Sequence, residues 1–183
     1  MSNNSFRDKF FRIKSSSTSV NLASPTGVDS LQSTLHASKF VLCCEQGDLS
    51  TLRTITRHYD DDLSSLINHE DSNTHKSGLI YAAINGHVHI VNELIDLNAD
   101  IELCHDGSTP LYHAVSRGHI DIAKVLLLHK ANVNAINNKG WTCLMNAAYF
   151  GRDDIVRLLL QHRADPDIIR SDFDGKSALH FGL

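Results

Sequence analysis

The chain lacks the residues that several protein classes require. It has only four cysteines, Cys43, Cys44, Cys104 and Cys143, which show neither metal-site spacing nor the density of a disulfide scaffold. We therefore expect free thiols. No apolar run approaches the roughly 18 residues that a bilayer crossing needs, and the N-terminus lacks the apolar stretch of a secretory signal. These absences predict an intracellular, cytoplasmic protein, with the nucleus as the alternative.

The charge balance and the absent catalytic motifs exclude further classes. The formal net charge is −4 and the isoelectric point is near 6.3, so no excess of positive charge attracts nucleic acid or anionic membranes. The sequence contains no Gly-rich phosphate loop, nucleophile elbow or H-E-x-x-H motif, which predicts that the protein is not an enzyme. His87 and His89 have no third ligand at metal-site spacing, so we expect neither a metal nor another cofactor.

What the chain does contain is an internal repeat. Similar segments recur at a period of about 33 residues, which is typical of stacked helical units that are each too small to bury their own apolar face. Two sets of small residues mark the repeat, namely Gly47, Gly86, Gly118 and Gly151, and then Ala99, Ala131 and Ala164.

Each copy reads as a hydroxyl residue, a short apolar helix, a glycine, a second apolar helix and a polar loop. The hydroxyl should cap the first helix, and the glycine should end it in the left-handed conformation. Apolar residues at helical spacing, such as Ile122, Val125 and Leu126, place the second helices in an outer layer. The predicted caps are Ser38, Ser77, Thr109, Thr142 and Ser177.

These copies resemble the ankyrin repeat. Residues 106–134 contain, in order, Asp-Gly-x-Thr-Pro-Leu, Gly-His, Val-Leu-Leu-Leu and Ala-Asn-Val-Asn. The next copy departs from the motif with Cys143 in place of proline and Arg152 in place of histidine. The resemblance covers roughly residues 38–183 and implies an all-α ankyrin repeat solenoid of stacked helix-turn-helix units with protruding β-hairpin-like loops. It also implies scaffold roles for His87 and His119, and for His180 a role in bridging neighbouring loops by hydrogen bonds.

The repeat sets the expected domain boundaries. Residues 1–28, rich in Ser, Thr and Asn, should form a disordered tail, and residues 29–183 the ankyrin repeat domain. The last copy stops inside its first helix, which suggests a fragment of a longer array or an end covered by a partner. The expected repeats are about 38–72, 73–105, 106–137 and 138–170, with a partial copy at 171–183.

The predicted tail contains one segment with a pattern of its own. Between Phe6 and Lys14, apolar residues lie at helical spacing among basic residues. A plain flexible tail, a short docking motif, and weak membrane contact or a targeting signal all fit this pattern. Ser15 and Ser24 lie in short patterns typical of kinase sites.

The resemblance implies a protein-binding groove. In an ankyrin stack, the concave groove is formed by the loop tips before each first helix and by the two residues before its closing glycine. Aromatic residues gather in the last two copies, so we expect the strongest contacts there, although Trp141 could instead pack over its own loop. The predicted groove residues are Asn73, Thr74, Lys76, Ile84, Asn85, His105, Asp106, Ser108, Ser116, Arg117, Asn138, Lys139, Trp141, Tyr149, Phe150, Phe173, Asp174 and Lys176.

The predicted function is that of a non-catalytic scaffold or adaptor that holds a protein partner in this groove. One alternative is a regulatory or substrate-recruiting segment of a larger enzyme or channel that continues beyond Leu183. Another is self-association at the uncapped end. Asn134 ends a segment similar to ankyrin-repeat sites that are hydroxylated on asparagine, with capping of a turn as the simpler interpretation.

Overall fold

The computed structural model describes the backbone of residues 25–59, 62–169 and 176–181, and side chains within these ranges from residue 34 onward. The chain divides into two compact units, Met1–Thr34 and Leu35–Leu183. The repeats lie in the second unit. Most of the predicted tail, with Ser15 and Ser24, lies outside the described residues, as do Phe173 and Asp174.

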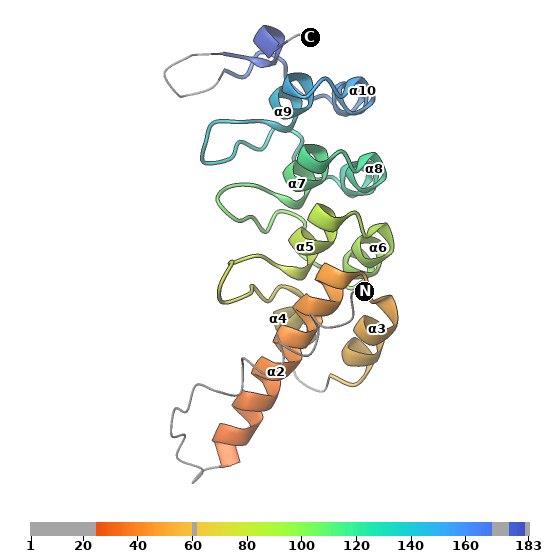
Figure 1. Ribbon diagram of the computed structural model, residues 1–183, viewed down its shortest axis with the longest axis vertical. Coiled ribbons are helices and arrows are strands. Elements are labelled where there is room, and N and C mark those ends of the chain that lie inside the picture. The colour runs from red at the N-terminus through yellow and green to blue at the C-terminus, as the bar shows by residue number, and fades with distance from the viewer. Residues whose placement is uncertain (1–24, 60–61, 170–175, 182–183) are drawn as a thin grey trace, which may run out of the picture. The chain divides into compact units, whose positions relative to one another are not determined.

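Helices of the second unit form two rows (Figure 1). From α5 onward, each helix of the inner row packs on the next inner helix, and consecutive outer helices do the same from α6 to α10. The loops project from the side of the inner row that faces away from the outer helices. The inner helices are the end of α2 (Pro25–Gln46), α5 (Gly78–Asn85), α7 (Pro110–Arg117) and α9 (Cys143–Tyr149), followed by the 3₁₀ helix η1 (Ala178–Phe181). The outer helices are α3 (Leu49–Arg57), α6 (Val88–Asp96), α8 (Ile120–Leu128) and α10 (Asp153–Gln161).

The middle inner helices begin and end at the predicted residues. Ser77, Thr109 and Thr142 have extended backbones, and each side-chain oxygen accepts the N–H of the residue three positions later. Gly86 closes α5 with φ 79°, and a Cβ atom there would lie 2.8 Å from the ring of His119. The turn and the close packing of the next repeat therefore both require glycine at this position.

The first inner helix corrects the sequence prediction. Helix α2 begins at Pro25 and continues through Ser38, so Ser38 is an interior residue and not a cap. Residues 25–28 are likewise helical, where the prediction placed the end of the tail. The physical reason is local, since proline suits the first turn of a helix and neither proline nor glycine interrupts the chain from Val28 to Gln46.

The first polar loop contains a short helix that the sequence analysis does not predict. Helix α4 (Leu63–Ile67) follows Asp62, whose carboxylate accepts the backbone N–H of Ser64 at 3.0 Å. Leu66 and Ile67 are buried in the core. This part of the long loop therefore contributes apolar surface to the stack.

One continuous core runs through the helix pairs from Ala37 to Ala178. The core contains apolar residues of the outer helices, as the repeat pattern predicts. It also contains small residues of the inner helices, such as Ala114 and Ala147. Cys43, Cys44 and Cys143 are buried in it as free thiols, which confirms the prediction, and Cys104 is an exposed free thiol. The described residues form isolated backbone bridges at the loops but no strand, so the all-α solenoid is confirmed.

Candidate functional site

Hydrogen bonds across repeat boundaries hold the inner helices together. The Nε2–H group of His87 donates to the Glu45 carbonyl at 3.0 Å, and that of His119 donates to the Ile84 carbonyl at 3.0 Å. Arg152, which replaces the motif histidine in the next copy, donates through Nη1 to the carbonyl of Val115. The predicted scaffold roles of His87 and His119 are confirmed.

His180 has a more local role than the resemblance implies. Its Nδ1 atom lies 3.1 Å from both the backbone N and the Oγ of Ser177. Because the backbone N–H can only donate, Nδ1 accepts this hydrogen bond and closes the turn that begins η1. A bridge from His180 to a neighbouring loop is not seen in the described part of the chain.

A second set of bonds joins the outer turns. The side-chain oxygen of Asn68 accepts the Asp100 N–H at 2.8 Å, and one repeat later Glu102 accepts the Asn132 N–H at 2.7 Å. Asn134 continues the series, since its Oδ1 accepts the N–H of Asp165 at 2.9 Å. These contacts support a structural, turn-linking role for Asn134. Its hydroxylation stays a prediction.

The loops before the inner helices also contact one another. The carbonyl of Asp106 accepts the N–H of Asn138 at 3.1 Å, which links two successive loop tips. Gly107, the residue after Asp106, has φ 68°, and a Cβ atom there would lie 2.7 Å from the Asn138 Oδ1. The loop tips are therefore positioned by backbone contacts before any partner arrives.

One predicted groove residue is not available to a partner. Ser108 is only 8% exposed, and its Oγ accepts a hydrogen bond from Asn137 at 3.5 Å. The side chain is buried at the base of this loop, where the backbones of His105 and Ser108 pair and Asn137 of the next repeat contacts it. The prediction of Ser108 as a groove contact is wrong.

Four aromatic residues meet at one end of the inner row and are called here the aromatic cluster: Trp141, Tyr149, Phe150 and Phe181. Trp141 and Phe181 are half-buried against the core, with ring centroids 5.1 Å apart. The ring of Tyr149 meets Trp141, Phe150 and Phe181 edge-on, at 5.5, 5.1 and 5.7 Å. Tyr149 and Phe150 are 59% and 54% exposed. The cluster thus has a packed base and an exposed rim.

Three apolar residues on the loops and in η1 were not among the predicted groove residues. Phe181 lies four residues after Ser177, at the position that Asn146 holds relative to Thr142, and this shared register was the signal available. Ile136 and Ile169 are exposed apolar residues one repeat apart, each on the first arm of a loop that precedes an inner helix. A comparison of equivalent loop positions would have found them.

Positive groups converge near the middle of the inner row. Burial lowers the pKa of His113 to about 4, and the charges of Lys76, His105 and Arg117 act in the same direction. These groups come from the loop before α5, the loop before α7 and the end of α7. The Nε2 atom of His113 is buried and has no hydrogen-bond partner among the described residues.

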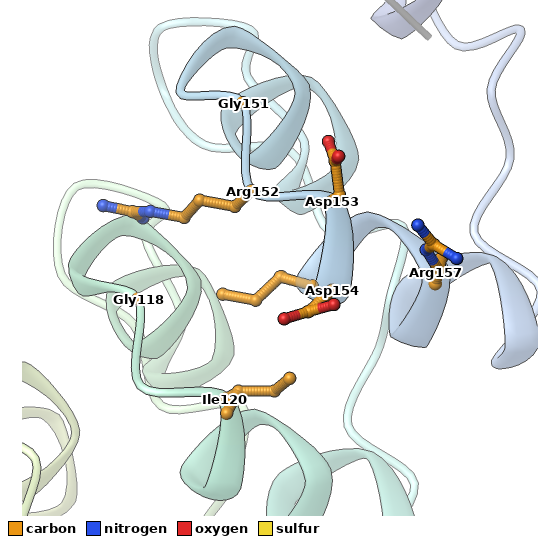
Figure 2. A pocket seen from close by; sticks show the side chains of 8 residues that line it. Gly118, Ile120, Gly151, Arg152, Asp153, Asp154 and Arg157 are labelled. Carbon is orange, nitrogen blue, oxygen red and sulfur yellow. The ribbon is translucent and has the colours of Figure 1, made fainter.

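An open hollow of about 480 Å³ lies elsewhere, between the starts of α8 and α10. Arg152 extends along one side of it towards Gly118, and Asp154 lies near Ile120 (Figure 2). It contains none of the predicted groove residues. In the described ranges, no group of three or more His, Cys, Asp or Glu residues has a geometry that could hold a metal ion.

The structure is that of a helical repeat protein with a rigid inner face. Its paired helices are in register, hydrogen bonds join neighbouring repeats, and backbone contacts position the loop tips. The family model for ankyrin repeats (3 copies) matches residues 40–137 and 127–183. The chain therefore belongs to the ankyrin repeat family. Ankyrin repeats are non-catalytic modules that generally bind other proteins.

Curated relatives share parts of this chain. The palmitoyltransferase AKR1 of Lachancea kluyveri is 32% identical over 110 residues, which are 58% of this chain and 14% of that protein. Ankyrin repeat domain-containing protein 13B of Mus musculus is 43% identical over 61 residues, 33% of this chain and 10% of that protein. The 2-5A-dependent ribonuclease of Mus musculus is 40% identical over 68 residues, 36% of this chain and 9% of that protein. The matches thus cover small fractions of much longer proteins.

Helix length and hydropathy bear on whether any segment could cross a membrane. None of the helices in the described part of the chain is both long enough and apolar enough to cross a membrane.

Proposed function

We propose that the chain is a protein-binding module of the scaffold or adaptor type, and that its partner contacts the loop tips and the ends of the inner helices. The observation that carries this proposal is the exposure of Tyr149 and Phe150. The equivalent positions of the neighbouring copy hold Ser116 and Arg117, so the repeat does not need aromatic rings there for its own packing. Exposed aromatic groups of this kind are typical of the residues that dominate interface energies.

The bonds between repeats support the same function. Because His87, His119 and Arg152 fix each inner helix to the one before, the binding residues are held in place in the unbound protein. A partner then binds with little loss of conformational entropy on this side of the interface. A few well-placed side chains are sufficient for specific binding under these conditions.

The test exchanges the aromatic pair for the residues of the neighbouring copy, as Tyr149→Ser with Phe150→Arg. Partners captured from native extract by the full chain are identified by quantitative mass spectrometry, and the affinity of each purified partner is then measured. We expect the double variant to weaken binding by at least about tenfold, since hot-spot residues contribute 2 kcal/mol or more.

The matched control is Leu128→Ser, which removes a 69% exposed apolar side chain from outer helix α8. It should bind partners as the original chain does, and both variants should keep its melting midpoint. Equal binding by the aromatic double variant and the original chain would refute the proposal. A lower melting midpoint with unchanged affinity would instead assign Tyr149 and Phe150 to the scaffold.

A further inference from the structure

Among the described residues, four cations lie on the loops before α5, α9 and η1 and at the end of α7. Lys139 and Lys176 are exposed on the loops before α9 and η1, Lys76 is half-buried before α5, and Arg117 is exposed at the end of α7. Glu70 and Asp71, before α5, and Asp106, before α7, are acidic residues of these loops, and the Asp106 carboxylate lies 3.2 Å from Nε2 of His105. The chain as a whole has 21 acidic and 17 basic side chains.

The basic groups from different repeats act on the same region. Both Lys76 and Arg117 disfavour a proton on His113, although they belong to adjacent repeats. A carboxylate placed between them would be attracted by both cations. Asp71 and Glu70 lie in the same loop as Lys76 and partly offset its charge, because a carboxylate that accepts hydrogen bonds keeps its negative charge. Arg117 and Lys139 are therefore the main cations of this surface.

The apolar part of the surface adjoins the basic part. Tyr149 and Phe150 lie one repeat beyond Arg117 in the same register, and Lys139 lies two residues before Trp141. Arg152 holds the base of this region, since its guanidinium lies 5.1 Å from the Phe150 ring centre while it donates to the Val115 carbonyl. The surface thus offers an aromatic rim at one end and several cations along its length.

We infer that the partner presents an acidic peptide segment with an aromatic or aliphatic anchor residue, whose anchor packs on Tyr149 and Phe150 and whose carboxylates lie at Arg117, Lys139 and Lys76. This inference rests on the proposed function and specifies the chemistry of the partner. Complementary charge speeds association and disfavours wrongly charged segments, and the aromatic contact supplies the main apolar contribution.

Charge also distinguishes an acidic peptide from other possible occupants of this surface. The segment Phe6–Lys14 of the same chain is basic, so the cations would repel it. A nucleic acid would need phosphate contacts along a continuous basic stripe, whereas Asp106 interrupts this one. A second copy of the chain could present acidic residues such as Asp153 and Asp154, and this occupant is tested directly below.

The experiment selects random 12-residue peptides displayed on phage against the immobilised full chain. A synthetic peptide with the consensus of the enriched pool is then titrated by fluorescence anisotropy against four proteins. These are the original chain, Arg117→Glu/Lys139→Glu, Tyr149→Ser/Phe150→Ser, and the control Lys124→Glu/Arg157→Glu. The control makes the same change of net charge on outer helices α8 and α10. Serine at both aromatic positions keeps the charge of the surface constant.

We expect the enriched pool to contain more Asp and Glu, together with more Phe, Leu or Trp, than the starting library. Arg117→Glu/Lys139→Glu should weaken binding of the consensus peptide by about tenfold or more, and the control by less than about twofold. Binding should also weaken as the salt concentration rises from about 0.1 to 0.5 M. If the reversed charges prevent folding, as seen in the melting midpoint, alanine at both positions replaces glutamate.

Several results would overturn the inference. A neutral or basic pool, or no enrichment over bare support, contradicts an acidic partner segment. Affinity that is lost in the aromatic variant but unchanged in Arg117→Glu/Lys139→Glu also overturns it, yet leaves the proposed function intact. Unchanged affinity in both variants makes the proposed function fail as well. Preferential binding of single-stranded RNA, or a dimer in sedimentation that the charge reversal dissociates, assigns the surface to another occupant.

Discussion

The indole of Trp141 stacks on the ring of Phe181, with centroids 5.1 Å apart and 23° between the ring planes. Trp141 precedes inner helix α9, and Phe181 ends η1, so this pair joins the fourth repeat to the last described turn. Tyr149 meets both rings edge-on and is more exposed than either. The stacked pair therefore fixes the position of the exposed ring that we assign to partner binding.

Phe181→Ser tests this support. The change removes the face of the stack and leaves Trp141 in contact with water, so the free energy of unfolding should fall by about 1 to 3 kcal/mol. The chain has one tryptophan, so its fluorescence reports on this site alone, and the emission should shift to longer wavelength. Thermal circular dichroism and the emission spectrum measure the two effects.

Leu179→Ser is the matched control, because Leu179 lies on the same turn of η1 and is exposed. It should leave both the melting midpoint and the emission maximum unchanged. An unshifted emission maximum in Phe181→Ser would show that the ring does not shield the indole.

Local chemistry explains which parts of the fold were predictable from the sequence. Thr109 and Gly118 each determine one end of α7 through their own backbone conformations, so their spacing was sufficient to place the helix. The start of α2 was not predictable from the same pattern, because a helix with no terminating residue continues past a serine that could have capped it.

The candidate site was predictable only in part. Tyr149 and Phe150 were identified because their positions in the repeat differ in chemistry from the other copies. Ser108 was misassigned because its burial depends on the side chain of Asn137 in the next repeat. Phe181 was missed for the same kind of reason, since its partner Trp141 is distant in the sequence and the stacking depends on tertiary packing.

His119→Ala tests the bonds between repeats. The change leaves the Ile84 carbonyl without its ring N–H donor, so the free energy of unfolding should fall by about 1 to 2 kcal/mol. Because each repeat is stabilised by its neighbours, the loss should also make unfolding in urea less cooperative. The slope and midpoint of urea unfolding, followed by circular dichroism, measure both effects. His89→Ala, at an exposed position on α6, should change neither.

The cysteines should differ strongly in reactivity. Burial raises the pKa of Cys143 to about 12 and also raises the pKa of Cys43 and Cys44, so little thiolate forms at these sites at pH 8. Cys104 is exposed. Iodoacetamide at pH 8 should add a single label at Cys104 to the folded chain, and further labels only in denaturant. Peptide mass spectrometry locates the label, and early labelling of Cys143 would contradict the buried position.

His113 should make the protein sensitive to acid. Burial, with Lys76, His105 and Arg117 nearby, lowers the pKa of His113 to about 4 from the ordinary 6.5. Between these pH values the unfolded chain binds a proton that the folded chain does not, so stability falls as the pH falls through this range. From pH 7 to pH 5 the loss due to this residue should be about 1 to 2 kcal/mol.

His113→Leu should remove this loss, because leucine cannot bind a proton. It also removes a buried Nε2 atom that has no hydrogen-bond partner among the described residues, so stability at pH 7 should stay equal or rise by about 1 kcal/mol. Urea unfolding at pH 7 and pH 5 gives the four free energies that are needed. His89→Leu, an exposed histidine on α6, should keep the original pH dependence. If His113→Leu loses as much stability on acidification as the original chain, His113 is not the group responsible.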